Sequence, residues 1–348
     1  MKEKLTNAAL FIGTIIFTLL VLEVGLRAYH GEWGYANFRF PQQNKFNYHT
    51  YDAELGWVPK QEQVNGWGGT VTTVREGIRS NGHGEVWDGT GDPILAVGDS
   101  YTFGDQVTDS ETWPAQLEKF SGRRVINGGV DGYGVDQTFL RARRLLGRYR
   151  FSAVIFSFIP DDVRRSQMSV MFATAKPYFD LKDGRLTLEN IPVPPPSFLP
   201  QKESELLIAV EHSRFVHAVM KRLFPEWWLR APSETQVQDQ EKGIKVACAL
   251  LHKLEGLTKS RGSELIVLAQ HGEEETSWES MAAESVLSCL SDSATRVLDM
   301  APALSELKAK DPSRYHRLYN QSRHMSAEGN QFVAHEILKI LTSKVNAG

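Results

Sequence analysis

The chain has 348 residues, of which 41% are hydrophobic and 23% charged, and its formal net charge is −3. This composition is that of a folded protein with a sizeable core, and the length suits one large domain or two small ones. The charge gives no basis for nucleic-acid binding, and the sequence contains no basic arm, zinc-ligand spacing or RNA-binding aromatic motif.

The N-terminal segment is apolar enough to span a membrane. Residues Ala8–Leu22 carry no charge, and apolar residues resume after Glu23 and continue to Leu26. A helix of this length crosses a bilayer at about 1.5 Å per residue. Lys2 and Lys4 precede the stretch, and no small-residue cleavage pattern follows it.

We therefore predict a cytoplasmic tail over residues 1–7 and an uncleaved signal anchor over residues 8–26. The lysines on its N-terminal side place the remaining chain in the periplasm or another extracytoplasmic space. A cleaved signal peptide and a buried core helix are the alternatives.

Residues 31–90 are rich in glycine, tryptophan and asparagine and predict a lead-in of loops and short strands. Strand-like and helix-like segments then alternate through residues 91–348, which predicts a doubly wound parallel α/β domain. The predicted strands are Ile94–Val97, Val125–Asn127, Ala153–Phe158, Leu265–Ala269 and Val297–Leu298. The predicted helices lie around Glu111–Phe120, Val135–Leu146, Gln240–Lys259, Trp278–Leu290 and Ala327–Leu341, the last with Ser326 as N-cap.

An insertion at about residues 163–240 interrupts this alternation. It contains a predicted hairpin turned by Asp183-Gly184, a proline run, a helix and an apolar tip. These segments are Tyr178–Leu181 with Arg185–Leu188, Pro192–Pro200, Ser204–Phe224 and Pro225–Trp228. We expect a lid or cap beside the site; a packing element without a substrate role is the alternative.

The chain has two cysteines, Cys248 and Cys289, both in helix-like stretches. Two cysteines exclude a disulfide framework. Because buried free cysteine is common, we expect free thiols, with a single bridge as the alternative.

Polar residues follow the carboxyl ends of the predicted strands. Open parallel sheets bind their ligands at this edge. Ser100 stands at a strand-to-helix turn, where backbone N–H groups can meet negative charge that develops on a substrate. A distant histidine could serve it as general base. The residues concerned are Ser100, Asn127–Gly134, Pro160–Asp162, His271 and His324. His271 could approach the site from the fourth strand, but we interpret it as a hydrogen-bonded structural histidine.

Gly98-Asp99-Ser100, the glycine block at 127–134, the pair Asp161-Asp162 and the block His324–Gly329 resemble the SGNH (GDSL-type) hydrolase superfamily. The resemblance covers about residues 50–345, apart from the insertion. It implies a flavodoxin-like sheet, with hydrolysis of esters or acyl transfer and no cofactor or metal. The chain is also similar to membrane-associated members that add or remove acetyl groups on exported polysaccharides.

By this resemblance Ser100 is the nucleophile and His324 the general base. The N–H groups of Ser100 and Gly132 would donate to the oxyanion. Alternative roles are a helix cap for Ser100, a turn glycine for Gly132, and a solvated or capping function for His324.

The first departure from the family pattern is Asp161, which stands where the family has an oxyanion-donating Asn. Either Asp161 is held protonated and donates, or the oxyanion hole works with backbone donors alone. Capping of the following helix by Asp161 or Asp162 is the structural alternative. Asp99 and Asp162 are predicted as supporting residues.

The second departure concerns the acid that orients the histidine, because Gln321 and Ser322 occupy the family's aspartate positions. Both are predicted as supporting residues. A backbone carbonyl could orient His324, or Asp299 or Asp311 could reach it. The remaining alternatives are a Ser–His dyad of modest rate and a degraded enzyme.

The sequence thus predicts a membrane-anchored serine esterase or O-acyltransferase acting on acetylated cell-envelope or exported glycans, with no nucleic-acid partner. Hydrolysis and transfer share the acyl-serine step, so both remain open. The alternatives are a glycan-binding export accessory protein without turnover and a lipid-directed esterase.

Overall fold

The computed structural model describes residues 2–31, 33, 48–66, 68–83, 87–171, 174–195, 210–224, 228 and 240–343. The chain divides into two compact units. The larger comprises Tyr48–Met171, Ala175–Pro195 and Gln236–Gly348; the smaller comprises Met1–Asn47, Phe172–Thr174 and Pro196–Thr235.

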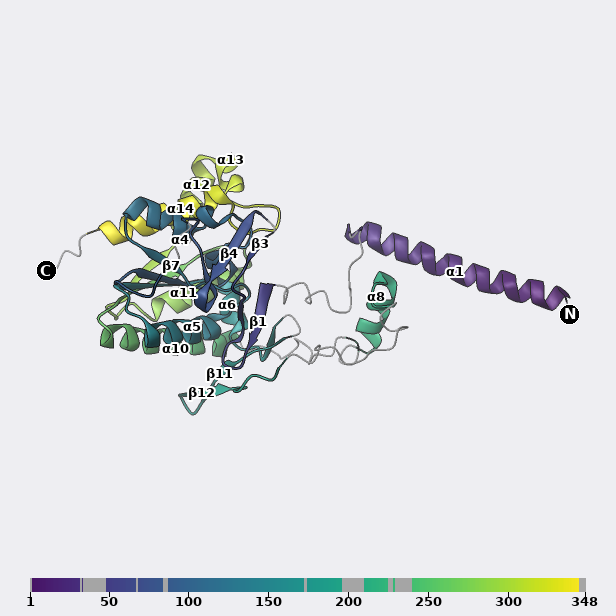
Figure 1. The fold of residues 1–348 in the computed structure, drawn as a ribbon, viewed down its shortest axis with the longest axis horizontal. Helices are drawn as coiled ribbons and strands as arrows, with labels where there is room; N and C mark the ends of the chain where they lie inside the picture. The colour runs from purple at the N-terminus through teal and green to yellow at the C-terminus, as the bar shows by residue number, and fades with distance from the viewer. Residues whose placement is uncertain are drawn as a thin grey trace. The chain divides into compact units, whose positions relative to one another are not determined.

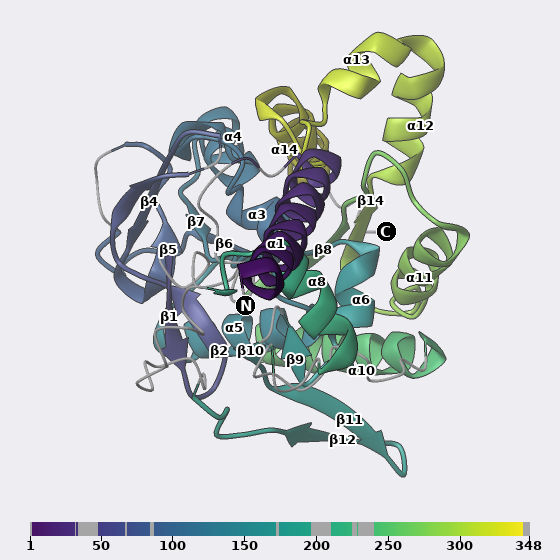
Figure 2. The ribbon, with the colours of Figure 1, turned by 90° about the vertical axis from the view of Figure 1, so that its right-hand side faces the viewer.

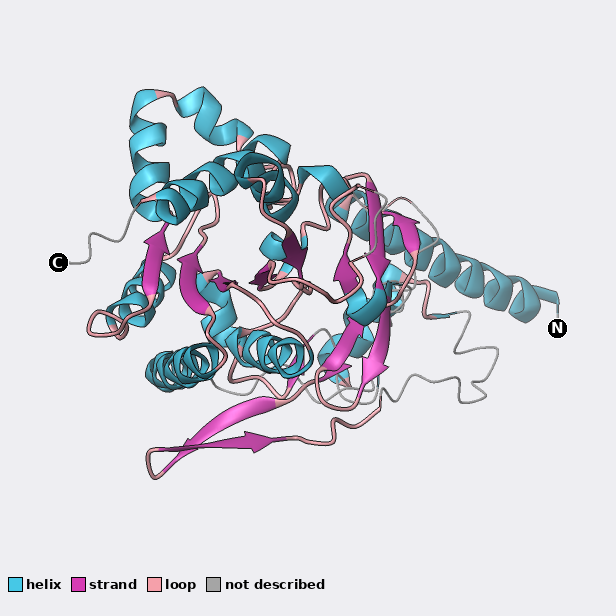
Figure 3. Ribbon diagram, turned by 60° about the vertical axis from the view of Figure 1, so that its left-hand side comes forward, coloured by secondary structure: helices cyan, strands magenta, loops and turns pink. Residues whose placement is uncertain are grey.

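The larger unit is built on an eight-stranded sheet of order β14-β13-β8-β6-β7-β5-β4-β3. Figure 3 shows strands in magenta between the cyan helices. Five of its strands are parallel. Numbered 1 to 5 along the chain, they run 2-1-3-4-5 across the sheet, which is the flavodoxin-like order. The fold class is therefore confirmed. The strands are β6 (Ile94–Val97), β7 (Val125–Asn127), β8 (Ala153–Phe158), β13 (Glu264–Ala269) and β14 (Arg296–Asp299).

Three short antiparallel strands extend the sheet beyond β7. They are β3 (Gln63–Asn65), β4 (Thr70–Val74) and β5 (Ile78–Arg79), with the 3-10 turn η1 (Arg75–Gly77) before β5. A separate hairpin joins β1 (His49–Asp52) to β2 (Gly56–Pro59). The lead-in segment thus supplies one side of the sheet with edge strands.

Helices cover both faces of the parallel strands (Figure 1). On one face α5 (Val135–Arg148) packs against α10 (Gln240–Ser260), and on the other α4 (Trp113–Ser121) packs against α14 (Ala327–Thr342). β6 and β8 are buried along their whole length, so their residues face helices on both sides. Burial of each large apolar side chain contributes about 1.5–3 kcal/mol.

Shorter helices complete the larger unit. They include α12 and α13, which pack on one another (Figure 2). The short helices are α3 (Ser100–Phe103), η2 (Asp109–Glu111), α6 (Pro160–Arg165), α11 (Ser277–Ser288), α12 (Ala301–Lys310) and α13 (Pro312–Arg317).

The first part of the insertion contains the predicted hairpin, β11 (Tyr178–Lys182) and β12 (Arg185–Glu189), after the short pair β9 (Val170–Met171) and β10 (Thr174–Ala175). Asp183 (φ 50°) and Gly184 (φ 72°) form its turn with the positive φ angles of a type I′ connection. β11 packs on α5 and α10. The hairpin therefore packs on these two helices, and the lid or cap role predicted for the insertion stays a prediction.

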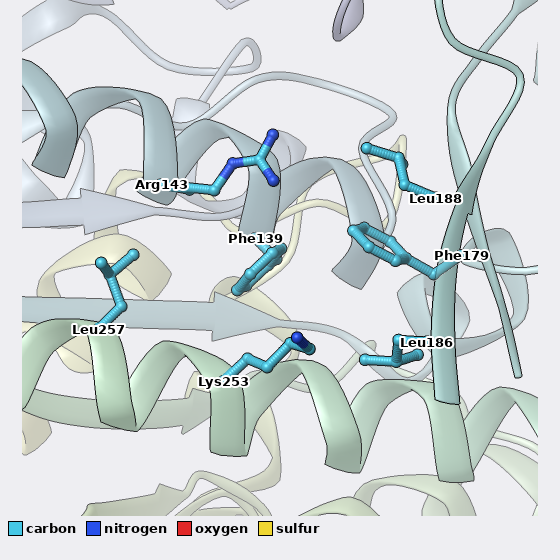
Figure 4. A pocket seen from close by; sticks show the side chains of 7 residues that line it. All are labelled: Phe139, Arg143, Phe179, Leu186, Leu188, Lys253 and Leu257. Carbon is cyan, nitrogen blue, oxygen red and sulfur yellow. The ribbon is translucent and has the colours of Figure 1, made fainter. Parts of the chain in front are cut away.

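An apolar groove lies under this hairpin (Figure 4). Its volume is about 320 Å³, and none of the predicted catalytic residues lines it. The lining side chains are Phe139, Arg143, Phe179, Leu186, Leu188, Lys253 and Leu257.

The expectation of free cysteines is wrong, because Cys248 and Cys289 form a disulfide. Cys248 lies on α10 and Cys289 directly after α11, and these two helices pack together. Their Cα atoms are 6.0 Å apart, within the range that a bridge requires.

The smaller unit contains α1 (Lys2–His30) and α8 (Arg214–Leu223), which lie side by side (Figures 1 and 2). By length and composition α1 could cross a membrane over Leu10–His30. The helix predicted around Ser204–Phe224 begins at Arg214 with Ser213 as N-cap. Residues 196–209 and 225–227, with part of the predicted proline run and apolar tip, lie outside the described residues.

Candidate active site

Ser100 sits at a tight turn between the buried strand β6 and the short helix α3. Gly98 makes this turn feasible, because a Cβ there would lie 2.8 Å from the Ser157 carbonyl oxygen and would also clash with the Thr102 hydroxyl. The turn leaves Ser100 as the first residue of α3, with 7% of its surface exposed. A small side chain is thus presented at the carboxyl edge of the sheet.

Asp99 caps α3 from the preceding position. Its Oδ1 accepts the Tyr101 N–H at 3.0 Å. Within the residues that the structure describes, the Ser100 N–H donates to no acceptor. Asp99 therefore satisfies the second N–H of the helix and leaves that of Ser100 available to a ligand.

His324 completes a hydrogen-bonded pair with Ser100. The two residues are 224 positions apart in the sequence, and the distance from Ser100 Oγ to His324 Nε2 is 2.9 Å. This is the distance at which an imidazole can take the proton of a serine hydroxyl. The structure therefore brings the predicted nucleophile and base together.

The loop that carries His324 is organised by Asn320. Its Oδ1 accepts the Ser322 N–H (2.9 Å), the Ser322 hydroxyl (2.6 Å) and the His324 N–H (3.3 Å). Arg323 has a φ of 65°, a conformation that costs a non-glycine residue energy. The Arg323 carbonyl accepts the Tyr101 hydroxyl at 2.8 Å, and the Tyr101 ring lies beside the imidazole, with centroids 5.2 Å apart. α3 and the histidine loop thus hold each other in place.

The other imidazole nitrogen faces Ser322. His324 Nδ1 lies 3.2 Å from the Ser322 carbonyl oxygen and 3.3 Å from its hydroxyl. Neither remote aspartate that we considered reaches it, because Asp299 pairs with His271 and Asp311 caps α13. In the tautomer that lets Nε2 accept the Ser100 hydroxyl, Nδ1 carries the ring proton and can donate a hydrogen bond to the Ser322 carbonyl. Gln321 has no hydrogen bond to His324 in the described part of the chain.

Of the two alternatives for Asp161, its ion pairs favour the one in which the carboxylate is ionised and backbone groups are the donors. Its carboxylate accepts from Arg164 Nε at 2.5 Å and from Arg165 Nε at 2.8 Å. Burial alone would raise the pKa of Asp161, but the two arginines lower it below its ordinary value. An ionised carboxylate has no proton to donate, so an oxyanion hole at this site would depend on other donors.

Asp162 takes the capping role instead, as its Oδ2 accepts the Ile159 N–H at 3.0 Å at the start of α6. Its Oδ1 accepts from Arg165 at 2.8 Å. Burial raises the pKa of Asp162 well above its ordinary value, and the charge of Asp99 raises it further, while Arg165 opposes the shift.

Arg165 is the site residue that sequence reasoning missed. It contacts three carboxylates: Asp161 and Asp162 directly, and Asp99 at 3.5 Å. The pKa of Asp99 is raised by burial, and Arg165 counteracts that rise. The i,i+3 and i,i+4 spacings on α6 could have revealed the first two contacts. The link to Asp99 depends on the adjacency of β6 and β8.

The glycine block after β7 supplies a second candidate oxyanion donor. The Asn127 side chain donates to the Thr102 carbonyl (3.0 Å) and accepts the Gly129 N–H (3.1 Å), which ties the block to α3. Gly132 has a φ of 73°, which favours glycine. Its N–H has no acceptor among the described residues. The turn role and the donor role are therefore compatible.

His271 belongs to a separate ion-pair cluster. Its Nδ1 lies 2.9 Å from Glu275 and its Nε2 lies 2.7 Å from Asp299. Burial opposes its charge, but hydrogen bonds to Asp299 and Glu275 raise the pKa of His271 to about 9. A charged histidine held by two carboxylates is a structural element, and it is not paired with Ser100.

No family model and no curated protein matches the chain. Solved structures with a similar fold include a protein ascribed to the G-D-S-L family of lipolytic proteins from Desulfitobacterium hafniense DCB-2. It is 15% identical, with a TM-score of 0.40, and the match covers 72% of this chain and 99% of that one. The acetylxylan esterase Axe2 from Geobacillus stearothermophilus is 14% identical, with a TM-score of 0.41 and coverages of 73% and 95%.

The esterase EstA from Pseudoalteromonas sp. is 12% identical, with a TM-score of 0.39 and coverages of 72% and 97%. These similarities are too distant to assign a reaction to this chain. Its chemistry must therefore be inferred from the contacts of Ser100 and His324.

Proposed function

We propose that this protein is an SGNH-type serine enzyme that transfers acyl groups from esters through an acyl-serine intermediate. The observation that carries the proposal is the 2.9 Å contact between Ser100 Oγ and His324 Nε2, formed by residues that are 224 positions apart in the sequence. The two N–H groups without acceptors, at Ser100 and Gly132, support it.

In the first half-reaction His324 Nε2 takes the proton of Ser100 as Oγ bonds to the ester carbonyl carbon. The carbonyl oxygen becomes an oxyanion, which accepts hydrogen bonds from the N–H groups of Ser100 and Gly132. Each such donor is worth about 3–4 kcal/mol in the transition state. The intermediate then expels the alcohol, which receives the proton from the imidazolium, and acyl-Ser100 remains.

In the second half-reaction water or a sugar hydroxyl gives its proton to His324 and attacks the acyl-serine. The new tetrahedral intermediate then collapses, the acyl–Oγ bond breaks, and Ser100 Oγ regains its proton from His324 Nε2. Water gives hydrolysis, and a sugar hydroxyl gives transfer. In both halves the Nδ1–H of the imidazolium donates a hydrogen bond to the Ser322 carbonyl oxygen, and this proton stays on the ring. A neutral carbonyl stabilises this cation less than a carboxylate does, so we expect a slower enzyme than a full triad provides.

We propose acetylated glycans of the cell envelope as the substrate class, with the body of the protein outside the cytoplasm. α1 is suited to anchor the chain in a membrane. The Cys248–Cys289 disulfide is the form that cysteines take in an oxidising compartment. The acetyl preference rests on the family resemblance of the Gly98–Ser100 and His324–Gly329 motifs.

The test is a paired assay of the full-length protein in detergent. 4-Nitrophenyl acetate is offered alone and with an oligosaccharide acceptor, and 4-nitrophenyl palmitate is offered in mixed micelles. Release of acetate without acceptor supports hydrolysis, and acetylated oligosaccharide supports transfer. Preference for palmitate would support a lipid-directed esterase instead.

Ser100→Ala and His324→Ala are the matched variants for this assay. We expect Ser100→Ala to abolish turnover and His324→Ala to lower kcat by at least about 100-fold. The proposal would be contradicted if wild type and Ser100→Ala had equal rates on the acetate alone, on the acetate with oligosaccharide and on the palmitate. That result would favour a binding protein without turnover.

A further inference from the structure

The transition from apolar to charged sequence on α1 coincides with the contact that it makes with the insertion. Residues 5–22 carry no charge, which corresponds to about 27 Å of helix and approaches the thickness of a bilayer's hydrocarbon core. Large apolar side chains along this stretch are exposed, among them Phe11 and Phe17, each at 68%. Glu23 is the first charged residue after it, so its carboxylate is expected at a membrane surface.

Glu23 fixes the first turn of α8 to α1. Its carboxylate accepts the backbone N–H groups of Arg214 (2.9 Å) and Phe215 (2.8 Å) and the hydroxyl of Ser213 (2.9 Å). Arg27, one turn further along α1, donates to Glu23 at 2.5 Å and to the His212 carbonyl at 2.6 Å. A helix from the middle of the chain is thus capped by a carboxylate of the N-terminal helix.

α8 is strongly amphipathic. Its apolar residues recur at the three- and four-residue spacings that place them on one face, and its charged residues lie on the other. The apolar set is Phe215, Val216, Val219, Met220 and Leu223, and the basic set is Arg214, Lys221 and Arg222. The apolar face continues into exposed surface at the end of the helix, where Leu223 is 61% and Phe224 is 56% exposed.

Trp228 folds back onto α8. It is 1% exposed, and its indole Nε1 lies 3.2 Å from His217 Nδ1, to which it donates. Trp228 is therefore anchored to the side of α8 that carries His217. This arrangement leaves Leu223 and Phe224 as the apolar tip of the described part of the insertion.

We propose that α8 is an interfacial helix that lies in the headgroup layer of the bilayer that α1 crosses. Glu23 sets its depth, Leu223 and Phe224 insert at the edge of the acyl chains, and Lys221 and Arg222 face anionic headgroups. Basic amphipathic helices with apolar anchors bind membranes in this way. The occupant is the lipid surface because α8 is attached to α1 where the uncharged stretch ends. The inference does not depend on the chemistry of Ser100.

The experiment uses the full-length protein in vesicles of phosphatidylethanolamine and phosphatidylglycerol. Phe224→Cys is labelled with an environment-sensitive nitrobenzoxadiazole dye, and quenching by nitroxide lipids is measured. The native cysteines form a disulfide, so the new thiol is the reactive one. Phe17→Cys on α1 and Met281→Cys on α11, which is 48% exposed, are the membrane and solvent controls.

We expect headgroup nitroxides to reduce the emission at position 224 at least twofold and deep nitroxides to affect position 17 more strongly. Position 281 should be unaffected. A position 224 that behaves like position 281 would overturn the proposal. So would a blue shift at position 224 that persists in detergent and rises with protein concentration, because a second copy would then cover the apolar tip.

A separate variant tests whether Glu23 sets the depth of α8. Glu23→Ala removes the acceptor for three donors of the α8 turn, so quenching at position 224 should fall while that at position 17 stays unchanged. Unchanged quenching at position 224 would show that Glu23 does not set the depth of α8.

Discussion

At the scale of single residues, His324 is held by main-chain atoms in place of a carboxylate. Its Nδ1 lies 3.2 Å from the Ser322 carbonyl, and Asn320 fixes the turn that presents this carbonyl. Loss of the orienting acid from a complete triad costs about 10⁴ in kcat without abolishing catalysis. The activity that remains without the acid depends on the oxyanion donors and on the correct tautomer of the histidine. A backbone carbonyl that accepts from Nδ1 is sufficient to select that tautomer.

Substitution of Ser322 tests this arrangement. Ser322→Asp places a carboxylate 2 residues before the histidine, near the hydroxyl that lies 3.3 Å from Nδ1. We expect kcat/KM on 4-nitrophenyl acetate to rise by at least about tenfold, because a charge now stabilises the imidazolium. Ser322→Ala keeps the carbonyl and should stay within about threefold of wild type. A large loss of kcat/KM in Ser322→Ala would mean that the Ser322 hydroxyl, and not its carbonyl, orients the His324 imidazole.

Much of the site could be predicted from the sequence, because the motif residues lie next to strand ends. Ser100, His324 and the block containing Gly132 are identifiable in this way. The ionised state of Asp161 could not be predicted, because it depends on which way Arg164 and Arg165 turn. The tertiary contact of Arg165 with Asp99 leaves no trace in sequence spacing.

At the scale of elements, α6 brings positive charge to the carboxylates beside Ser100. Arg165→Met leaves Asp161, Asp162 and Asp99 without their shared cation. We expect a loss of about 3–5 kcal/mol in stability, as for a broken buried ion pair, and a fall in kcat/KM of at least about 100-fold. Urea unfolding and the acetate assay measure these two effects.

Arg164→Met is the matched control for this variant. Arg164 is on the same helix, its side chain is 36% exposed, and within the described part of the chain it forms an ion pair only with Asp161. For Arg164→Met we expect the free energy of unfolding to change by no more than about 1 kcal/mol and kcat/KM by no more than about threefold. Equal effects of the two substitutions would argue against a special role for Arg165.

The turn between β6 and α3 gives a second test at this scale. Gly98→Ala adds a Cβ that would lie 2.8 Å from the Ser157 carbonyl, so the turn that carries Ser100 must move. We expect loss of activity and destabilisation of about 1–3 kcal/mol from overpacking. Gly147→Ala on α5, where an added Cβ meets nothing within 4 Å, should be neutral or stabilising by up to about 1 kcal/mol. Full activity in Gly98→Ala would contradict the geometry of the turn.

The five parallel strands of the sheet were predictable because they are short apolar runs with polar ends, as in Ile94–Val97 and Ala153–Phe158. The individual edge strands β3, β4 and β5 were not predicted, and neither were the two features that follow. α8 begins at Arg214 because Ser213 and Glu23 cap it, and the second of these belongs to another helix. The disulfide forms because α10 and α11 face each other, which follows from packing and not from the spacing of the cysteines.

At the scale of the whole molecule, two structural devices stabilise the domain that carries the site. The Cys248–Cys289 bridge closes a loop with a sequence separation of 41 residues. The chain-entropy relation gives about 4 kcal/mol for such a loop. The double variant Cys248→Ala/Cys289→Ala should lose about this amount of its free energy of unfolding, measured with urea. Wild-type protein under reducing conditions lacks the same bridge and is the comparison. A loss below about 1 kcal/mol would contradict the prediction.

The His271 cluster predicts a pH-dependent stability. In the folded protein the pKa of His271 is raised to about 9, against about 6.5 for an unfolded chain. Its contribution is therefore complete below about pH 6.5 and is lost as the pH rises through 9, by at most about 3 kcal/mol. Urea unfolding between pH 6 and 10 should show this decline in wild type and a flatter profile in His271→Gln. Parallel profiles would contradict the assignment.

The central claim is that Ser100 is a nucleophile activated by His324. The most direct measurement is reaction with a fluorophosphonate, followed by digestion and mass spectrometry of the modified peptide. We predict that wild-type protein carries the phosphonyl group on Ser100, that His324→Ala reacts at least about 100-fold more slowly, and that Ser100→Ala is unmodified. Absence of labelling in folded wild-type protein, or labelling that persists in Ser100→Ala at the same rate, would contradict the claim.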